Sequence, residues 1–327
     1  MVVSMVSPAT DHPLLIWTDG DRAELIEALL ARLPGVVVQA VGGPSRAGLP
    51  ELAERFGSES QNDPRRLLLD HPGAAVLLGT SRGIGAELLG QAIAAGTVIL
   101  AIEPLPFALP PLPRTPSGGQ GGVALFPWFR LSPAWKSAVE APKALGQITS
   151  VAFSALCPHG QLSLFAQLYG AMDLLLDLLG PADTVDASLT GPLVEAPEDV
   201  TALTGDLSAH LRFADRAAAT IQLSDRAGQW RRRLVAIGTE GQLTLEDDTY
   251  QLLGPSGQIL DEVMAGSKPA VEPAALMGYQ WQHLVDRLAN PDPSDPAQLL
   301  ASCQATVLSC RTGQLESPRR LMELYGA

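Results

Sequence analysis

Residues 74–104, AAVLLGTSRGIGAELLGQAIAAGTVILAIEP, carry the pattern from which the fold can be inferred. The apolar runs AAVLLGT at 74–80 and TVILAI at 97–102 have the length and β-branched content of buried strands. Between them, GAELLGQAIAAG at 85–96 places apolar residues at helical spacing and ends on glycine, a common helix stop. The segment therefore predicts a parallel strand–helix–strand unit.

The same alternation occupies the chain upstream of this segment. The predicted strands are PLLIWT (13–18) and VVVQAV (36–41), and the predicted helices are RAELIEALLARL (22–33), LPELAERFG (49–57) and DPRRLLLDHP (63–72). Strands alternating with helices predict a Rossmann-like, doubly wound parallel sheet. Ligands of such sheets bind at the carboxyl ends of the strands. Those ends carry Thr18, Gly43, Thr80 and Glu103.

The chain changes character after a segment dense in proline and glycine, PLPFALPPLPRTPSGGQGG at 104–122, which we interpret as a domain boundary. We expect one domain over residues 1–120 and an α/β domain over residues 121–327. The second domain has an apolar helix, YGAMDLLLDLLG, and strand-like runs that predict an open, mainly antiparallel sheet. These runs are ITSVAFSAL, SAHLRFA, AAATIQLS, RRLVAIGT, GQLTLED and TYQLLG.

Composition narrows the class of partner. The formal net charge is −13, and a surface of that sign repels phosphate backbones, so we expect no nucleic-acid partner. The three cysteines lack metal-binding spacing, and the five histidines are scattered, so we expect no metal. The chain lacks a signal-peptide pattern and an apolar run of ~18 residues. We therefore expect a cytoplasmic protein with no membrane partner.

Six segments, in this order along the chain, resemble the glucose–fructose oxidoreductase / inositol dehydrogenase family, often written Gfo/Idh/MocA. They are AAVLLGT, AAGTVILAIEPLP, FRLSPAWKSAVEAPKALGQITSV, MDLLLDLLG, IGTEGQLTL and SCRTGQ. The resemblance implies a dinucleotide-binding first domain and a second domain that contacts a small-molecule substrate. It also implies NADP or NAD as cofactor, a sugar, cyclitol or related alcohol as substrate, and a homo-oligomer formed through the second sheet.

The chain departs from this family where the dinucleotide would bind. Thr18-Asp19-Gly20-Asp21-Arg22-Ala23 stands in place of G-x-G-x-x-G/A, and Gly43 stands in place of the acid that binds the ribose. We expect Asp19 and Asp21 to cap the first helix. A carboxylate ~6 Å from a phosphate costs roughly 3 kcal/mol at an effective dielectric of ~20. The candidate cofactor-binding residues are Thr18, Gly20, Arg22, Ala23, Gly43, Ser45, Arg46, Thr80, Ser81 and Pro104.

The candidate catalytic residues depart from the family as well. Glu103 stands where the family has a lysine before proline, and Gly170 replaces the histidine of H-x-x-D, whose aspartate is kept as Asp173. Alcohol oxidation needs a base for the hydroxyl proton and gains from a cation beside the alkoxide, and Glu103 cannot supply the cation. The candidate catalytic residues are Glu103 and Asp173, and the candidate substrate contacts are Arg130 and His159.

Three functions therefore remain open. The first is a weakly active or inactive oxidoreductase of this family with a degenerate cofactor and catalytic site. The second is a non-catalytic protein that binds a small molecule or assembles through its second sheet. The third is hydrolysis or dehydration by a pair of carboxylates, Glu103 and Asp173, which would need one protonated and one ionised group in a cleft.

Overall fold

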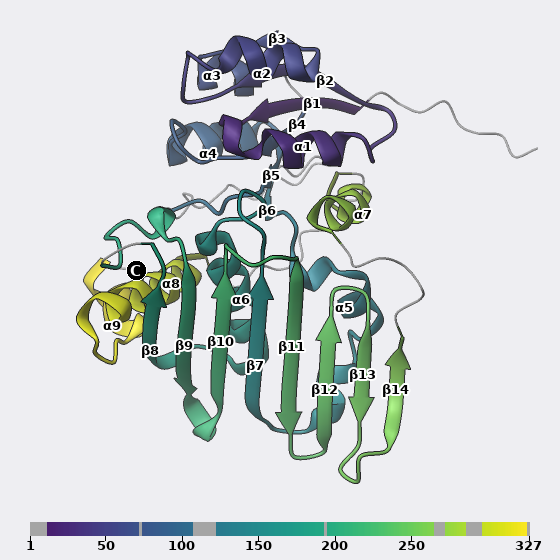
Figure 1. Cartoon of the computed structure of the whole chain (residues 1–327), viewed down its shortest axis with the longest axis vertical. Coiled ribbons are helices and arrows are strands. Elements are labelled where there is room, and N and C mark those ends of the chain that lie inside the picture. The colour runs from purple at the N-terminus through teal and green to yellow at the C-terminus, as the bar shows by residue number, and fades with distance from the viewer. Residues whose placement is uncertain are drawn as a thin grey trace, which may run out of the picture. The chain divides into compact units, whose positions relative to one another are not determined.

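The computed structural model describes residues 12–71, 74–106, 122–192, 195–264, 272–285 and 296–325 (Figure 1). The chain divides into two compact units. The described residues of the first unit are 12–71, 74–103, 122–126 and 277–285, and the remaining described residues form the second. The predicted boundary segment falls mostly on residues 107–121, outside the described residues, so the division at residue 120 stays a prediction.

In the described part of the first unit, six strands form one parallel sheet in the order β3-β2-β1-β4-β5-β6. The strands are β1 (His12–Trp17), β2 (Val36–Gly42), β3 (Glu59–Ser60), β4 (Ala75–Leu78), β5 (Val98–Ala101) and β6 (Gly122–Leu125). The helices between them are η1 (Gly20–Arg22), α1 (Ala23–Leu30), α2 (Leu49–Phe56), α3 (Pro64–Leu69) and α4 (Ala86–Ala94). The predicted Rossmann-like sheet is confirmed.

Burial explains why these segments form the sheet. Every residue of β4 is buried, as are the last three of β5, because helices cover both faces of a doubly wound sheet. Helix α2 ends where Gly57 adopts a left-handed conformation with φ of 61°, as its glycine stop predicts. Strand order reverses between β1 and β4, so the carboxyl ends of these two strands flank the crevice where such sheets bind ligands.

The second unit is built on a mainly antiparallel sheet, as predicted. Its described strands are β7 (Ile148–Leu156), β8 (Ala182–Thr190), β9 (Asp206–Phe213), β10 (Ala218–Ser224), β11 (Arg231–Gly238), β12 (Gly241–Glu246), β13 (Tyr250–Leu253) and β14 (Ile259–Val263). They lie in the order β14-β13-β12-β11-β7-β10-β9-β8. The β7–β10 pair is parallel, whereas the other pairs are antiparallel.

One face of this sheet is covered and the other is open. Residues of β9 alternate strictly between exposed and buried, and the buried set packs with helices α6 (Leu164–Leu179) and α8 (Pro296–Thr312) in one core. The open face carries small and polar side chains, including Ala152, Ser208, His210, Thr220 and Gln222. The other described helices are α5 (Pro133–Ser137), α7 (Pro273–Val285) and α9 (Pro318–Tyr325), with short turns η2 (Phe129–Leu131), η3 (Ala141–Leu145), η4 (Val200–Ala202) and η5 (Ala214–Arg216).

Strands β3, β6, β8 and β14 were not predicted from the sequence. β8 reads ADTVDASLT, whose aspartates and small residues have low strand propensity, and it forms because it pairs with β9 along its whole length. β6 is a four-residue run that follows a glycine-rich segment. Pairing with an existing sheet edge is what makes these short or polar segments extend.

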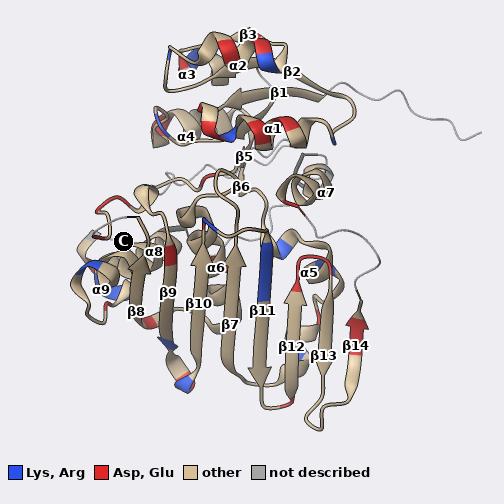
Figure 2. Ribbon diagram, in the orientation of Figure 1, with Lys and Arg blue, Asp and Glu red and all other residues tan. Residues whose placement is uncertain are grey.

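Strand β11 begins with three consecutive arginines, and this stretch of the strand is blue in Figure 2. Their burial alternates, so their side chains divide between the two faces of the sheet. Arg231 and Arg233 are exposed and lie 2.6 and 3.8 Å from Glu246. Arg232 points to the covered face, where its guanidinium donates to Asp247 Oδ1 at 2.6 Å. The alternation of a strand therefore places the middle arginine of this run inside the unit.

We expect Tyr250 to ionise far later than an ordinary tyrosine. Its hydroxyl donates to Asp261 Oδ2 at 2.6 Å, and this bond, burial and the nearby carboxylate raise the pKa of Tyr250 from 10 to about 12. Because the folded-state pKa is raised, this contact stabilises the fold up to about pH 10 and is lost between about pH 10 and 12. An absorbance titration of tyrosinate checks this, and Tyr250→Phe must remove the latest step.

Candidate functional site

Thr18 brings three strand ends of the first unit into close contact. It follows β1, is fully buried, and lies between Gly43 after β2 and Gly79 after β4. A Cβ on Gly43 would lie 2.3 Å from the Thr18 carbonyl oxygen, and a Cβ on Gly79 would lie 2.4 Å from Thr18 Oγ1. No side chain fits at either glycine. The acid that would bind a ribose after β2 is therefore excluded by packing at Gly43.

The turn after β1 begins with a short 3-10 helix, η1, before α1. Asp19 occupies the N-cap position, but its side chain makes no capping hydrogen bond, so the predicted cap at Asp19 is wrong. The turn is instead stabilised by its own backbone, because the Ala23 amide donates to the Gly20 carbonyl. Asp19 and the exposed Asp21 therefore place two carboxylates at the start of the helix.

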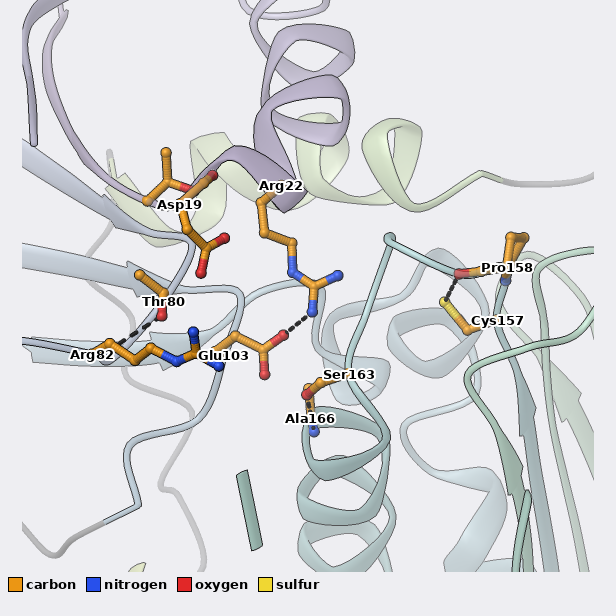
Figure 3. A network of polar contacts seen from close by, with 10 residues as sticks. Asp19, Arg22, Thr80, Arg82, Glu103, Cys157, Pro158, Ser163 and Ala166 are labelled. Atoms are coloured by element: carbon orange, nitrogen blue, oxygen red, sulfur yellow. Dashed lines mark hydrogen bonds and ion pairs between the residues drawn. The ribbon is translucent and has the colours of Figure 1, made fainter. Parts of the chain in front are cut away.

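Arg22 and Glu103 form an ion pair across the carboxyl edge of this sheet (Figure 3). Arg22 comes from η1 and Glu103 follows β5, so the pair passes the end of β4, which lies between β1 and β5 in the sheet. The two side chains are only 12% and 15% exposed. Partial burial strengthens the attraction over that of a surface pair. Both residues are site candidates by sequence, but their pairing is not predicted by it.

The other cofactor-binding candidates of the first unit differ in burial. Thr80 is buried, and its hydroxyl accepts from the Arg82 amide at 3.3 Å, whereas Ser81 is half-buried. Ser45 and Arg46 are exposed in the loop before α2. Pro104 belongs to the second unit. The structure thus brings together Thr18 with Gly43, and Arg22 with Glu103.

Asp173 lies in α6 of the second unit and is 1% exposed. Arg130 binds it with two hydrogen bonds, from Nε to Oδ2 at 2.9 Å and from Nη2 to Oδ1 at 3.1 Å. Trp128 Nε1 donates to the same Oδ2 at 2.7 Å, and the Arg130 guanidinium stacks 5.0 Å from the Trp128 ring. Asp173 is therefore held by three hydrogen bonds from Arg130 and Trp128, and it is a structural partner for Arg130.

Arg130 also donates from Nη1 to Asp177 Oδ1 at 2.9 Å, one helical turn beyond Asp173. Burial raises the pKa of Asp177, the Arg130 guanidinium opposes that rise, and the Asp173 carboxylate adds to it. Arg130 is expected from the sequence to contact a substrate, and this geometry supports a structural role for it.

A second cluster of the same composition lies in the same unit, and the sequence analysis missed it. Trp230 Nε1 donates to Asp247 Oδ2 at 2.9 Å, and Arg232 donates to Asp247 Oδ1 from Nε at 3.0 Å and from Nη2 at 2.6 Å. Arg232 stacks 5.0 Å from the Trp230 ring. The signal was a repeated W-x-R, found as WFR at 128–130 and WRR at 230–232.

The segment at residues 127–129 joins the two clusters. Arg232 Nη1 donates to the Pro127 carbonyl at 3.2 Å, and its guanidinium lies 5.2 Å from the Phe129 ring. Phe129 is 2% exposed and packs edge-on against Phe153 of β7. Both buried arginines are therefore organised around one aromatic segment.

The loop after β7 contains His159 and leads into α6. His159 is exposed. Ser163 caps α6 by accepting from the Ala166 amide at 3.0 Å (Figure 3). Gln167 in the first turns is 4% exposed, and its amide donates to the Ser224 carbonyl at 3.1 Å. The Oε1 atoms of Gln161 and Gln167 are buried and accept no hydrogen bond from the described residues.

Among the residues that the structure describes, no group of three or more histidine, cysteine, aspartate or glutamate side chains is arranged to hold a metal ion. None of the described helices combines the length and apolar character that crossing a membrane requires.

Comparison with known proteins relates the fold to oxidoreductases. No family model matches the sequence, and no curated protein matches it. A structure of levoglucosan dehydrogenase with NADH and L-sorbose is 20% identical, with a TM-score of 0.64 over 94% of this chain and 99% of that one. An oxidoreductase from Agrobacterium radiobacter with NAD+, L-tartaric acid and magnesium is 16% identical, with a TM-score of 0.65 over 95% and 100% of the two chains. GenD2 from gentamicin A biosynthesis, with NAD, is 19% identical, with a TM-score of 0.64 over 97% and 99%. The chain shares the fold of these NAD-binding oxidoreductases.

We expect Asp173→Ala to destabilise the protein by about 3–5 kcal/mol, because it leaves the buried Arg130 guanidinium without its main counter-charge. Urea unfolding measures this free energy. Asp183→Ala, an exposed aspartate on β8, is the matched control and should change stability by less than about 0.5 kcal/mol. Equal, small effects of the two substitutions would contradict a structural role for Asp173.

Proposed function

We propose that this chain is a divergent protein of the Gfo/Idh/MocA type in which dinucleotide-dependent alcohol oxidation is weak or lost. The shared fold and the ordered sequence segments support the family. The ion pair between Arg22 and Glu103 is the observation that carries the loss of activity. It joins the turn where a pyrophosphate would bind to the position where the family has a catalytic lysine.

The turn after β1 does not fit a dinucleotide pyrophosphate. Asp19, Asp21 and Glu24 place three carboxylates at the start of α1, and the nearby guanidinium of Arg22 is paired with Glu103. The Ala23 amide donates within the turn and is not available to a phosphate. Gly20 alone leaves the open space that a bound phosphate needs beside the backbone, because a Cβ there would meet nothing within 4 Å. Charge and hydrogen bonding together oppose an anion at this helix start.

The candidate catalytic carboxylates are both held by arginines. Glu103 is neutralised by Arg22, and Asp173 is bound by Arg130 and Trp128. To act as a general base, either carboxylate must leave its guanidinium partner so that its oxygens can accept a proton from a substrate. The same pairing disfavours the third function, because hydrolysis by a carboxylate pair also needs both groups to reach the substrate.

Small-molecule binding or assembly without catalysis is the second candidate function. The open face of the second sheet, with small side chains on β7, β9 and β10, supports assembly with a second copy.

We expect the unaltered protein to bind NAD and NADP with dissociation constants no tighter than about 100 μM, and to transfer no hydride from a panel of sugars and cyclitols. Glu103→Gln frees the Arg22 guanidinium for a phosphate and should tighten binding about tenfold, which corresponds to about 1.4 kcal/mol. Calorimetry measures the affinities.

Glu54→Gln, an exposed glutamate on α2, removes the same charge from the same unit and should leave the affinity unchanged. Robust turnover of any alcohol by the unaltered protein, or low-micromolar dinucleotide binding, would show that the site is functional and overturn the proposal.

We expect a dimer or larger assembly at tens of micromolar protein, formed through the open face of the second sheet. Light scattering measures the mass. Ala152→Glu places a charge on the exposed face of β7 and should yield monomers, whereas Ala202→Glu in η4, which packs near α6 and α8, should not. A monomeric unaltered protein would rule out assembly through this face.

A further inference from the structure

Trp17 occupies an unusual place for a large aromatic side chain. It is the last residue of β1, pairs in register with Gly42 of β2 and Leu78 of β4, and is 1% exposed. It therefore stands beside the point where strand order reverses, at the edge where doubly wound sheets bind their ligands.

The indole of Trp17 is wedged between the elements that follow β2 and β4. A Cβ on Gly42 would lie 2.6 Å from Trp17 Cε3, and a Cβ on Gly83 would lie 3.3 Å from Trp17 Cζ2. Trp17 Nε1 donates to the Arg82 carbonyl oxygen at 2.8 Å. Glycine at position 42 leaves the space that the ring needs. Gly83 has φ of +79°, a conformation that favours glycine, so the loop after β4 bends at the ring.

The two loops also approach each other directly. The Cβ position of Gly83, after β4, is 3.8 Å from Pro44 Cβ, after β2. In dinucleotide-binding sheets of this order the residue at the end of β2 contacts the adenosine ribose, so the adenosine lies at this side of the crevice. In this protein the indole of Trp17 lies on that side of the crevice, and its hydrogen bond to Arg82 holds the loop after β4. The loops after β2 and β4 also contact each other there.

We infer that the adenosine side of this crevice is filled by the protein's own Trp17, so that the first unit is closed to adenine nucleotides by packing as well as by charge. This inference deepens the proposed loss of dinucleotide binding and rests on it. The packing of Trp17 explains why position 42 is a glycine. It acts together with the packing at Gly43, which excludes an acidic side chain there. The exclusion of adenine nucleotides then has two separate causes, charge and packing. A substitution that removes the charge of Glu103 leaves the packing of Trp17 unchanged.

Trp17→Ala should open a cavity shaped for an aromatic ring. Such cavities accept small aromatic ligands, so free indole should raise the melting temperature of Trp17→Ala and leave that of the unaltered protein unchanged. In calorimetry, adenosine should bind Trp17→Ala at least about tenfold more tightly than it binds the unaltered protein. Adenosine is the probe because it carries no phosphate, which removes the effect of the carboxylates in the turn after β1.

Trp281→Ala is the matched control, since Trp281 is 4% exposed, lies in α7 and belongs to the same unit. It should show no gain in adenosine affinity. The inference is overturned when Trp17→Ala folds, as judged by circular dichroism and by its response to indole, yet binds adenosine no better than Trp281→Ala. Trp17→Leu keeps an apolar side chain, and the same measurements apply to it should Trp17→Ala fail to fold.

A measurement on the unaltered protein stands independently of these variants. The amides of residues 42, 43 and 81–84 should exchange with solvent at the same rate with and without millimolar adenosine, and protection of these amides would overturn the inference. Tight NAD binding by the unaltered protein would overturn the proposed function itself. Weak NAD binding with no gain in Trp17→Ala or Trp17→Leu would overturn only the role of Trp17.

Discussion

Close packing around Thr18 sets the geometry of the first unit at its functional edge. The Thr18 carbonyl contacts the backbone of Gly43, and its side chain contacts Gly79, so the ends of β1, β2 and β4 approach one another without room for side chains. A dinucleotide-binding edge normally uses glycines so that a ligand can approach the backbone. Here Thr18 and Trp17 of the protein itself occupy the space beside these glycines. The glycines therefore serve internal packing.

Internal ion pairs satisfy the charges that a ligand would otherwise meet. Arg22 in the turn after β1 bonds Glu103 after β5, and Arg130 bonds Asp173 in the second unit. Each of these carboxylates is engaged with a guanidinium, so a ligand would have to displace the arginine to reach it. A lysine at position 103 would face Arg22 with a like charge.

The two Trp–Asp–Arg clusters give the second unit its polar framework. Each buries an aspartate under a tryptophan N–H and a bidentate arginine, and residues 127–129 contact or flank both. Buried ion pairs contribute little net stability compared with apolar residues, but removing one partner is costly. The clusters therefore hold one particular arrangement of α6, β11 and the segment before α5, and Asp173 has a structural partner.

The sequence by itself determined the parallel first sheet, the mainly antiparallel second sheet and the identity of most residues at the carboxyl edge, because hydrophobic periodicity and strand order depend on local pattern. It also predicted that Thr18, Glu103 and Gly170 differ from the pattern of the family that the chain resembles. Only the tertiary structure decided that Arg22 pairs with Glu103, that Arg130 pairs with Asp173, and that Trp17 fills the space beside Gly42. These contacts join residues far apart in the chain; for Arg22 and Glu103 the separation is 81 positions. Side-chain direction and the space between strand ends are set by packing of the whole unit, and no local pattern encodes them.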